Sequence, residues 1–415
     1  MGKAWEYRNN LLYLEDVALD EVAERVGTPC YVYSSQAILS RYEAYDRSFG
    51  EVPHRICYAV KANSNLSVLG LLAKVGAGFD IVSGGELFRA LRAGANPASI
   101  VFSGVGKTRE EIEYALESGI HAFHCESEPE LALIESLAAR LNKQARVALR
   151  VNPDVDASTH PYISTGLKEH KFGIDIGEVE GVYDRARSLR HVRLEGVSCH
   201  IGSQLLNVDP LLESMDRMLA LVERLRAAGL PIQSLDLGGG VGVPYQPGDP
   251  EPSIEEFIEK ISQKAKGRNL MLMVEPGRSL VAEAGVLLSR VLYRKRNGAK
   301  DFIIVDAAMN DLIRPSLYQA HHEIIPVRRD ERRGAVVADV VGPVCESGDF
   351  LARNRHLANV LPGDLVAICT AGAYGFVLSS NYNSRPRAAE VLVAGAQYKI
   401  ARQRESYEDL IRGEQ

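Results

Sequence analysis

Short apolar runs alternate with amphipathic stretches along residues 55–278. The runs are rich in β-branched residues, as buried strands are, and they cover residues 55–61, 79–83, 100–104, 122–126, 147–151, 194–200, 234–237 and 270–275. The stretches between them repeat apolar residues with the period of a helix, as at 85–93, 109–118, 129–141, 178–188, 210–228 and 253–266. Eight strand–helix units of this length predict an α/β fold, a (β/α)₈ TIM-type barrel.

The pattern changes after residue 280. Long helical periodicity stops, and β-branched runs separated by turn residues follow at 285–293, 301–305, 335–341, 364–369 and 390–393. A further run at 30–33 would be a ninth barrel strand, so we assign it to this second, mainly β domain. We therefore predict a barrel over 36–280 and a β-sandwich or barrel-like domain built from 1–35 and 281–415. The stretch 244–252, rich in Pro and Gly, resembles a linker.

Composition narrows the class of protein. The 415 residues are 46% hydrophobic, enough for a large core divided between two domains. The net charge is −6 and basic residues cluster only in short pieces such as Arg328-Arg329, so we expect no binding to nucleic acid or membranes. Six cysteines without C-x-x-C spacing predict free thiols and no metal site. The sequence has neither a signal-peptide core nor a run of ~18 apolar residues, which predicts a cytoplasmic protein.

Lys61 closes the first predicted strand, at the end of an apolar run. Burial lowers the pKa of an ammonium group, so part of such a lysine is a neutral amine that can attack an aldehyde and form a Schiff base. The alternative is a lysine whose side chain extends from the strand end to water. The residues at the other strand ends favour the first interpretation.

Polar residues and glycines gather where the predicted barrel strands end. They are Asp80 and Ser83 on the second strand, His200 and Ser203 on the sixth, Gly238, Gly239 and Gly240 on the seventh, and Glu275, Gly277 and Arg278 on the eighth. Taken singly, Asp80 could cap a helix, His200 could be a core histidine, and the glycines could form a tight turn. Because barrel active sites lie at the C-terminal ends of the strands, their common position predicts a site.

The chemistry of these residues fits one cofactor. Glycines with unobstructed backbone N–H groups at a loop-to-helix turn bind a phosphate, and Gly277 adds to them. Glu275 beside a heteroaromatic nitrogen would keep that nitrogen protonated and make the ring an electron acceptor, while the flat ring of His200 lies on its face. An amine for an aldehyde, glycines for a phosphate and a carboxylate for a pyridine nitrogen together predict pyridoxal 5'-phosphate.

The motifs resemble the fold-type III, alanine-racemase-like family of pyridoxal phosphate-dependent decarboxylases. The resemblance extends over nearly the whole chain, from Glu6-Tyr7-Arg8-Asn9 to Tyr382-Asn383-Ser384-Arg385-Pro386. It implies that Lys61 is the Schiff-base lysine, with Glu275 on the pyridine nitrogen. The other implied cofactor contacts are Asp80, Ser83 and His200 at the ring, and Ser203, Gly239, the turn from Glu275 to Arg278, and Tyr374 on the phosphate side.

The predicted β domain contains the loop Gly342-Pro343-Val344-Cys345-Glu346-Ser347-Gly348-Asp349. In the family that the chain resembles, this loop completes the site of the partner subunit, so the resemblance implies a homodimer with shared active sites. A cysteine followed by an acid is by itself an ordinary loop sequence. The eight-residue match favours the family interpretation, in which Cys345 is the expected proton donor.

Members of the family decarboxylate different amino acids, including ornithine, arginine and carboxynorspermidine. We expect meso-2,6-diaminopimelate here, because Glu346 can bind its distal ammonium group and Arg314, with Tyr318 beside it, its distal carboxylate. The resemblance adds Arg278 and Tyr374 to the substrate contacts. The structural alternative for Arg314 is an ion pair with an acid in the β domain.

The expected reaction yields L-lysine and CO₂, the last step of lysine biosynthesis. The substrate amine displaces Lys61, the ring accepts the electrons left by CO₂, and the carbanion is protonated by Cys345, with Lys61 as a second candidate for one proton transfer. Three alternatives remain. They are a sibling decarboxylase for another basic or carrier-linked amino acid, a racemase, which needs a base on each face of the ring, and a non-catalytic pyridoxal phosphate-binding homologue.

Two positions depart from the family pattern. His124-Cys125 follow Phe123 where relatives often have Asn-Val, and Asn10 stands where glycine is common. We expect neither to touch the site.

Overall fold

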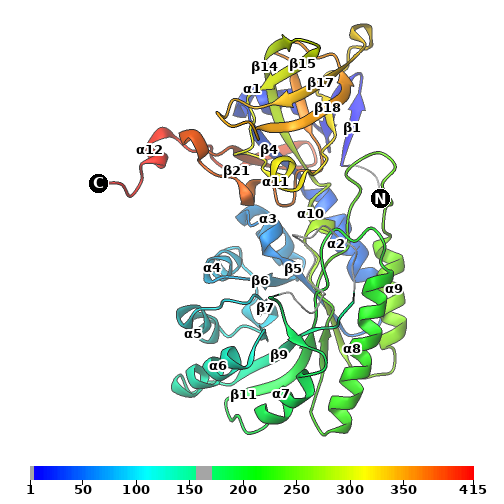
Figure 1. Ribbon diagram of the computed structural model, residues 1–415, viewed down its shortest axis with the longest axis vertical. Helices are drawn as coiled ribbons and strands as arrows, with labels where there is room; N and C mark the ends of the chain where they lie inside the picture. Colours follow the sequence, from blue (N-terminus) through cyan, green and yellow to red (C-terminus); the bar gives the residue numbers. More distant parts are fainter. Residues whose placement is uncertain (1–3, 156–170) are drawn as a thin grey trace. The chain divides into compact units, whose positions relative to one another are not determined.

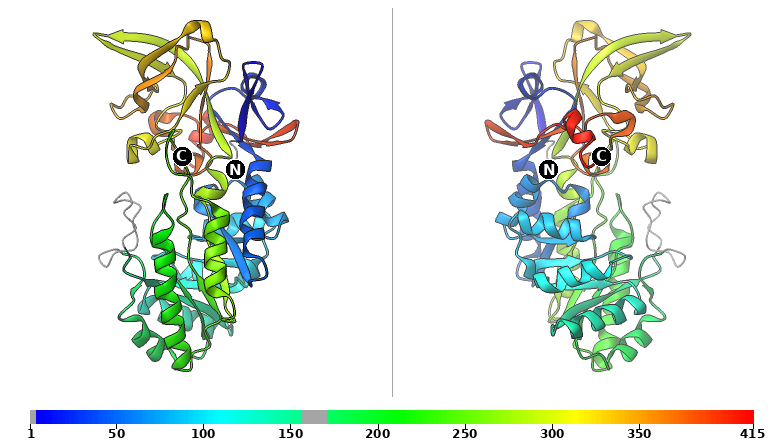
Figure 2. Two further views of the ribbon diagram at one scale, coloured as in Figure 1. Left: turned by 90° about the vertical axis from the view of Figure 1, so that its right-hand side faces the viewer. Right: turned by 90° about the vertical axis from the view of Figure 1, so that its left-hand side faces the viewer.

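The computed structural model describes residues 4–155 and 171–415. The chain divides into two compact units (Figures 1 and 2). Unit 1 contains the described residues up to Ser40, together with Pro244–Asp249 and Leu280–Gln415, and unit 2 contains Arg41–Val243 and Pro250–Ser279. The division between residues 40 and 41 falls inside helix α2 (Ser35–Phe49), which the sequence pattern did not predict.

Unit 2 is a closed barrel of eight parallel strands, as predicted. The strands are β5 (His54–Ala59), β6 (Gly78–Ile81), β7 (Ile100–Phe102), β8 (Ala122–Cys125), β9 (Ala145–Asn152), β11 (Val192–Ser198), β12 (Ser234–Asp236) and β13 (Met271–Val274). The order β9-β11-β12-β13-β5-β6-β7-β8 closes through a pairing of β8 with β9, and the short β10 (Ile174–Asp175) also pairs with β9. Each barrel strand overlaps one predicted run.

Helices follow the strands and lie on the outside of the barrel (Figure 1). They are α3 (Leu66–Lys74), α4 (Gly84–Arg92), α5 (Arg109–Ser118), α6 (Glu128–Arg140), α7 (Val179–Ala186), α8 (Asp209–Ala227) and α9 (Ile254–Ala265). The short α10 (Arg278–Val281) is divided between the two units, after Ser279. The helices α8 and α9 pack side by side (Figure 2). Polar side chains before five of these helices accept N–H groups of the first turn and fix where each helix begins: Asn65, Ser83, Thr108, Ser127 and Ser253.

The parallel direction of the strands brings their C-terminal ends to one rim of the barrel. Lys61 lies in a 3₁₀ turn (Val60–Ala62) directly after β5, and Asp80 lies on β6. His200 follows the end of β11, and Glu275 follows β13. The barrel therefore determines which of the predicted residues can meet.

Unit 1 is mainly β, also as predicted. Its strands are β1 (Trp5–Arg8), β2 (Leu11–Leu14), β3 (Val17–Ala18), β4 (Cys30–Ser34), β14 (Gly285–Asn297), β15 (Lys300–Val305), β16 (Ile324–Pro326), β17 (Ala335–Val341), β18 (Phe350–Ala358), β19 (Leu365–Ile368), β20 (Ala389–Ala394) and β21 (Gln397–Arg402). Three short helices accompany them: α1 (Leu19–Val26), α11 (Arg314–Tyr318) and α12 (Tyr407–Leu410). The strand β4 lies between β14 and β20, so the run at 30–33 belongs to the β unit, as assigned from the sequence.

Several features of unit 1 differ from the sequence prediction. The strands β1, β2, β3, β16, β18 and β21 match none of the predicted runs. The strand β18 was not predicted, because its middle, Arg353-Asn354-Arg355-His356, is polar and lacks the apolar alternation of a half-buried strand. It forms because it pairs antiparallel with β17. Most of the predicted linker also belongs to this unit, since the buried ring of Tyr245 packs against Arg314 and His322. Within residues 4–155 and 171–415, no helix is both long enough and apolar enough to cross a membrane.

Candidate active site

A cavity of about 420 Å³, here called the rim cavity, lies within unit 2 where the barrel strands end. Lys61, His200 and Glu275 line it. These residues come from the ends of β5, β11 and β13, so closure of the barrel brings together three residues that the sequence placed at one rim.

The amine of Lys61 is held by Asp80. Lys61 Nζ lies 2.9 Å from Asp80 Oδ2, and Asp80 is fully buried. The side chain of Lys61 is 37% exposed, so the sequence argument that burial makes this amine reactive is wrong. Burial and the charge of Glu275 raise the pKa of Asp80, whereas Lys61 lowers it. The other oxygen, Asp80 Oδ1, is buried without a hydrogen-bond partner in the described part of the chain.

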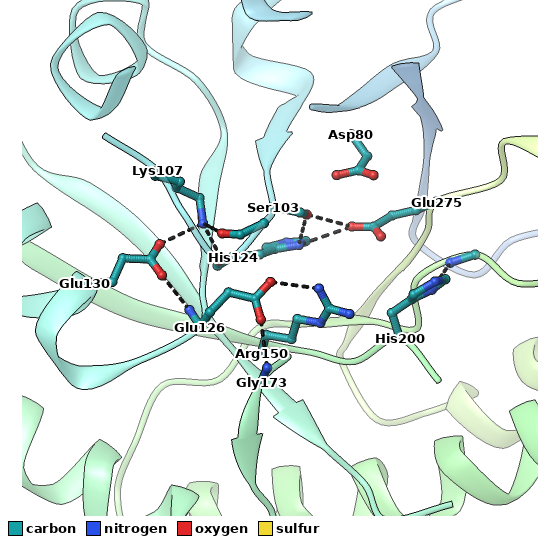
Figure 3. A network of polar contacts seen from close by, with 12 residues as sticks. Asp80, Ser103, Lys107, His124, Glu126, Glu130, Arg150, Gly173, His200 and Glu275 are labelled. Carbon is teal, nitrogen blue, oxygen red and sulfur yellow. Dashed lines mark hydrogen bonds and ion pairs between the residues drawn. The ribbon is translucent and has the colours of Figure 1, made fainter. Parts of the chain in front are cut away.

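Glu275 is an ionised carboxylate. Its Oε1 lies 3.2 Å from His124 Nδ1 and accepts a hydrogen bond from the Ser103 hydroxyl at 3.4 Å (Figure 3). Burial raises the pKa of Glu275, but the hydrogen bond and charge of His124, followed by Lys61, outweigh burial and lower it to about 2. An ionised carboxylate can accept a hydrogen bond from a protonated ring nitrogen.

His200 presents a neutral ring to the cavity. Burial and then the charges of Arg150 and Lys61 lower its pKa to about 3. Its Nδ1 accepts a hydrogen bond from the backbone N–H of Gly239 at 3.2 Å, which fixes the tautomer with the proton on Nε2. An uncharged, flat ring can pack against a cationic aromatic ring without charge repulsion.

The glycine loop after β12 is packed against its own barrel. The N–H of Gly238 donates to Asp236 Oδ1 at 2.8 Å, and that of Gly239 donates to His200. At most Gly240 of the three therefore has its N–H available to a phosphate in this arrangement. A side chain at Gly239 would collide with the carbonyl oxygen of Glu275, so glycine is needed there for close backbone contact.

The remaining predicted residues of unit 2 have defined local roles. Ser83 caps α4 by accepting the N–H of Glu86 at 3.2 Å. Arg278 Nη2 donates to Ser203 Oγ at 3.2 Å, which brings these two predicted residues together. Gly277 is buried in the turn that connects Glu275 to Arg278.

Five predicted residues lie in unit 1: Arg314, Tyr318, Cys345, Glu346 and Tyr374. Arg314 and Tyr318 are the two ends of α11, one helical turn apart. The buried guanidinium of Arg314 donates to His322 Nε2 at 2.9 Å and lies 4.4 Å from the ring centre of Tyr245. His322 Nδ1 lies 2.8 Å from the carbonyl oxygen of Cys369, so this nitrogen carries the proton and Nε2 is the acceptor for Arg314.

The loop that carries Cys345 and Glu346 exposes both side chains. Cys345 is the exposed cysteine, whereas the other five are buried. Asp349 shapes the loop by accepting the N–H groups of Met309 and Val344, each at 2.7 Å. The backbone of Tyr374 has φ 54°, a left-handed conformation that is costly for a residue with a side chain and is often found at functional sites.

Comparisons with known proteins identify the family. Residues 35–282 match the model of the pyridoxal-dependent decarboxylase, pyridoxal binding domain. The chain is 56% identical over 411 residues to a diaminopimelate decarboxylase of Pseudomonas aeruginosa, with 99% of this chain and 98% of that protein covered. The chain belongs to the diaminopimelate decarboxylase family.

Solved structures of diaminopimelate decarboxylases have the same fold. The enzyme from Helicobacter pylori, complexed with L-lysine, has a TM-score of 0.91 and 43% identity, and the match covers 95% of this chain and 98% of that chain. The enzyme from M. jannaschii, in complex with L-lysine, has a TM-score of 0.93 and 38% identity, and the match covers 99% and 97% of the two chains.

The cofactor of this diaminopimelate decarboxylase family is pyridoxal phosphate, and the rim cavity fits it. The cavity combines the amine of Lys61 with the ionised Glu275 and the neutral ring of His200. The buried, unpartnered Asp80 Oδ1 beside the amine is a further acceptor that a bound polar group would satisfy.

Three residues of this site were not predicted from the sequence of this diaminopimelate decarboxylase family member. They are Ser103, His124 and Arg150, and all three line the rim cavity. The expectation that His124 lies away from the site is wrong, since it contacts Glu275. The three come from the ends of β7, β8 and β9, the strands for which no strand-end residue was considered. Applying the strand-end rule to all eight strands would have found them.

Buried ion pairs support these three strand ends (Figure 3). Arg150 Nη1 pairs with Glu126 Oε1 at 2.7 Å. Lys107 Nζ donates to the carbonyl oxygen of His124 at 2.8 Å and pairs with Glu130 at 2.7 Å. Because breaking a buried ion pair costs ~3–5 kcal/mol, this network holds His124 in place.

Proposed function

We propose that this chain decarboxylates meso-2,6-diaminopimelate to L-lysine and CO₂, the last step of lysine biosynthesis. The observation that carries the proposal is the convergence of Lys61, His200 and Glu275 on one cavity in a chain of this family. The relatives named above are diaminopimelate decarboxylases, and two of the solved ones are complexed with L-lysine, the product of the proposed reaction. The free state of all six cysteines is consistent with a reducing compartment such as the cytoplasm.

Pyridoxal phosphate, when bound, supplies an aldehyde for amines and a pyridine ring that accepts the electron pair left by CO₂. Lys61 would hold the aldehyde carbon, with its Nζ positioned by Asp80. Glu275 would accept a hydrogen bond from the protonated ring nitrogen, and His200 would cover one face of the ring. Ser203, Arg278, Gly240 and Tyr374 would bind the phosphate side, with Gly277 in the same turn.

The distal end of the substrate carries an ammonium group and a carboxylate. Arg314 would bind the carboxylate, because a guanidinium can form two parallel hydrogen bonds with a carboxylate and this one is held in place by His322 and Tyr245. Tyr318 and Arg278 would assist, and Glu346 would bind the ammonium group. Cys345 is the proposed proton donor, with Lys61 as the second candidate for one proton transfer.

We also propose a homodimer in which the loop of Cys345 and Glu346 completes the site of the other subunit. The exposure of both side chains in the single chain is consistent with a role at a subunit interface. A buried catalytic loop would instead favour a site completed within one chain.

A direct assay tests the reaction. Purified protein loaded with pyridoxal phosphate should release CO₂ from meso-diaminopimelate, and at least about 10²-fold less efficiently from ornithine or arginine, which lack the distal carboxylate. Comparable kcat/KM for ornithine would instead support the sibling-decarboxylase alternative. Loss of the α-hydrogen without CO₂ would support a racemase, and cofactor binding without turnover would support a non-catalytic homologue.

Arg314→Ala should lower kcat/KM for meso-diaminopimelate by about 10²-fold or more, since the distal carboxylate would be left buried without a partner. Cofactor absorbance should be unchanged. The matched control is Arg353→Ala, which removes an exposed arginine of the same unit and should have little effect. If Arg314→Ala kept near-normal efficiency, Arg314 would be a structural residue and the substrate assignment would lose this support.

A further inference from the structure

His124 separates two cavities of the barrel. It lines the rim cavity together with Lys61 and Glu275, and it also lines a second cavity of about 320 Å³, here called the basal cavity. The basal cavity is bordered by Arg146 and Arg193, which are exposed and lie at the beginnings of β9 and β11. The basal cavity therefore opens at the N-terminal end of the barrel, opposite the rim where the cofactor binds.

Both nitrogens of the buried His124 ring face a carboxylate. Nδ1 lies 3.2 Å from Glu275 Oε1, and Nε2 lies 3.8 Å from Asp236 Oδ2. The Ser103 hydroxyl lies 3.2 Å from the same Nδ1 (Figure 3). A bare Nδ1 would direct its lone pair at the ionised carboxylate of Glu275, so this geometry places a proton on Nδ1.

The charges around His124 favour its protonated, imidazolium form. The carboxylates that act on it are Asp80 on β6, Asp236 on β12 and Glu275 after β13. The other titratable groups around it are His121, which precedes β8, and three groups that line the rim cavity with it: Lys61 after β5, Arg150 on β9 and the thiol of Cys199 after β11. Burial lowers the pKa of His124, but the carboxylates outweigh burial and raise it above its usual value. Burial and Glu275 raise the pKa of Asp236 well above its usual value, which leaves Glu275 as the ionised partner of His124.

We propose that His124 is a positioning residue that holds one carboxylate oxygen of Glu275 and compensates its negative charge. Solvent reaches His124 through the basal cavity. The proposal rests on the proposed function, because it takes Glu275 as the partner of the cofactor's ring nitrogen. With Oε1 held by His124 and Ser103, Oε2 is the oxygen presented to the ring. The imidazolium stabilises negative charge on the nearby Glu275 more than it disfavours positive charge on the more distant ring nitrogen, so it keeps the shared proton on the ring.

The charge of His124 can be separated from its hydrogen bond by substitution. His124→Asn keeps a neutral donor beside Glu275, whereas His124→Ala removes both donor and charge. His121→Asn is the matched control, because His121 lines the basal cavity but not the rim cavity, and burial with Arg55 and Arg146 lowers its pKa to about 3, so it is already uncharged.

The first readout is the absorbance of the bound cofactor in the holoenzyme, measured against pH without substrate. The wild type should change its spectrum as the pH rises and His124 loses its proton, at a pH above the usual pKa of histidine. His124→Asn should lack this transition and resemble the alkaline wild type at every pH, and His121→Asn should retain it. The kcat of His124→Asn should fall by about tenfold, the equivalent of one pKa unit, with KM within about twofold.

The second readout is rescue through the basal cavity. Free imidazole, which fits the space left in His124→Ala, should restore both the spectral transition and kcat, whereas thiazole, which has the same shape but no N–H group, should not. Rescue should increase with the protonated fraction of imidazole. If His124→Ala fails to fold, the spectrum of His124→Asn decides the positioning role.

Three results would overturn the proposal. A pH transition retained in His124→Asn would assign the titration to another group, and failure of imidazole to rescue a folded His124→Ala would exclude access through the basal cavity. One equivalent of bound metal in the purified protein would also overturn it, since His124, Asp236 and Glu275 offer ligand atoms within 4.8 Å of one another. Failure of the proposed function is distinguishable, because it would remove CO₂ release in the wild type while the spectral readout needs no substrate.

Discussion

Lys61→Ala should lose the visible absorbance that borohydride bleaches and should release CO₂ more than about 10³-fold more slowly than the wild type. The physical reason is that the Lys61 amine is the proposed nucleophile for the cofactor's aldehyde, and no water molecule can replace a covalent attachment. Asp80 holds the amine at 2.9 Å, so alanine removes the attached group while leaving its buried acceptor in place. Absorbance spectra before and after borohydride, followed by peptide mass analysis of the reduced protein, measure the effect.

The matched control for Lys61 is Lys74→Ala, which removes an exposed lysine at the end of α3, the helix that follows Lys61. Lys74→Ala should keep the absorbance and the activity. A cofactor still reducible onto Lys61→Ala would show that another amine makes the attachment. The buried Lys107 would then be the first to examine, although its three hydrogen bonds favour a structural role.

Mixing two inactive variants should restore activity if the active sites are shared. Lys61→Ala and Cys345→Ala homodimers should each be nearly inactive, because one lacks the amine and the other lacks the proposed proton donor. Random reassociation makes about half of the dimers mixed, and each mixed dimer has one site with both defects and one with neither. CO₂ release should therefore recover to about a quarter of the wild-type value if the sites are independent.

A second mixture provides the control for this experiment. Lys61→Ala mixed with Glu275→Ala should recover no activity, because both substitutions lie in unit 2 and every site of the mixed dimer keeps one of them. Exchange of subunits is followed separately with mass-tagged chains. Proven exchange without recovery in the first mixture would show that Cys345 serves the Lys61 of its own chain, and the shared-site proposal would be withdrawn.

Sequence alone determined the barrel and the rim residues that follow from it. Each of the eight apolar runs overlaps one barrel strand. These strands could be predicted because their length and β-branched composition are local properties of the sequence, which do not depend on the partner strands. Since all eight strands are parallel, residues at their C-terminal ends share one rim, which is why Lys61, His200 and Glu275 could be grouped from the sequence.

Only the tertiary structure decided how these residues are used. The sequence treated Lys61 as a buried amine, but its exposure and its pairing with Asp80 depend on how β5 and β6 lie next to each other. The glycines after β12 were expected to leave their N–H groups for a phosphate, yet two of these groups donate to Asp236 and His200. Local sequence cannot show the contacts of Lys61 with Asp80 and of Gly239 with His200, because each joins the ends of two different strands.

The placement of His124 illustrates the same limit. Its contact with Glu275 joins residues 151 positions apart, and the distance between them is set by the circumference of the closed barrel. In unit 1, the packing of Tyr245 against Arg314 likewise joins a stretch that resembled a linker to a short helix. Periodicity predicted the strands and their direction, but the contacts between side chains required closure of the barrel and packing of the β unit, since a hydrogen bond forms only when its two atoms lie about 3 Å apart.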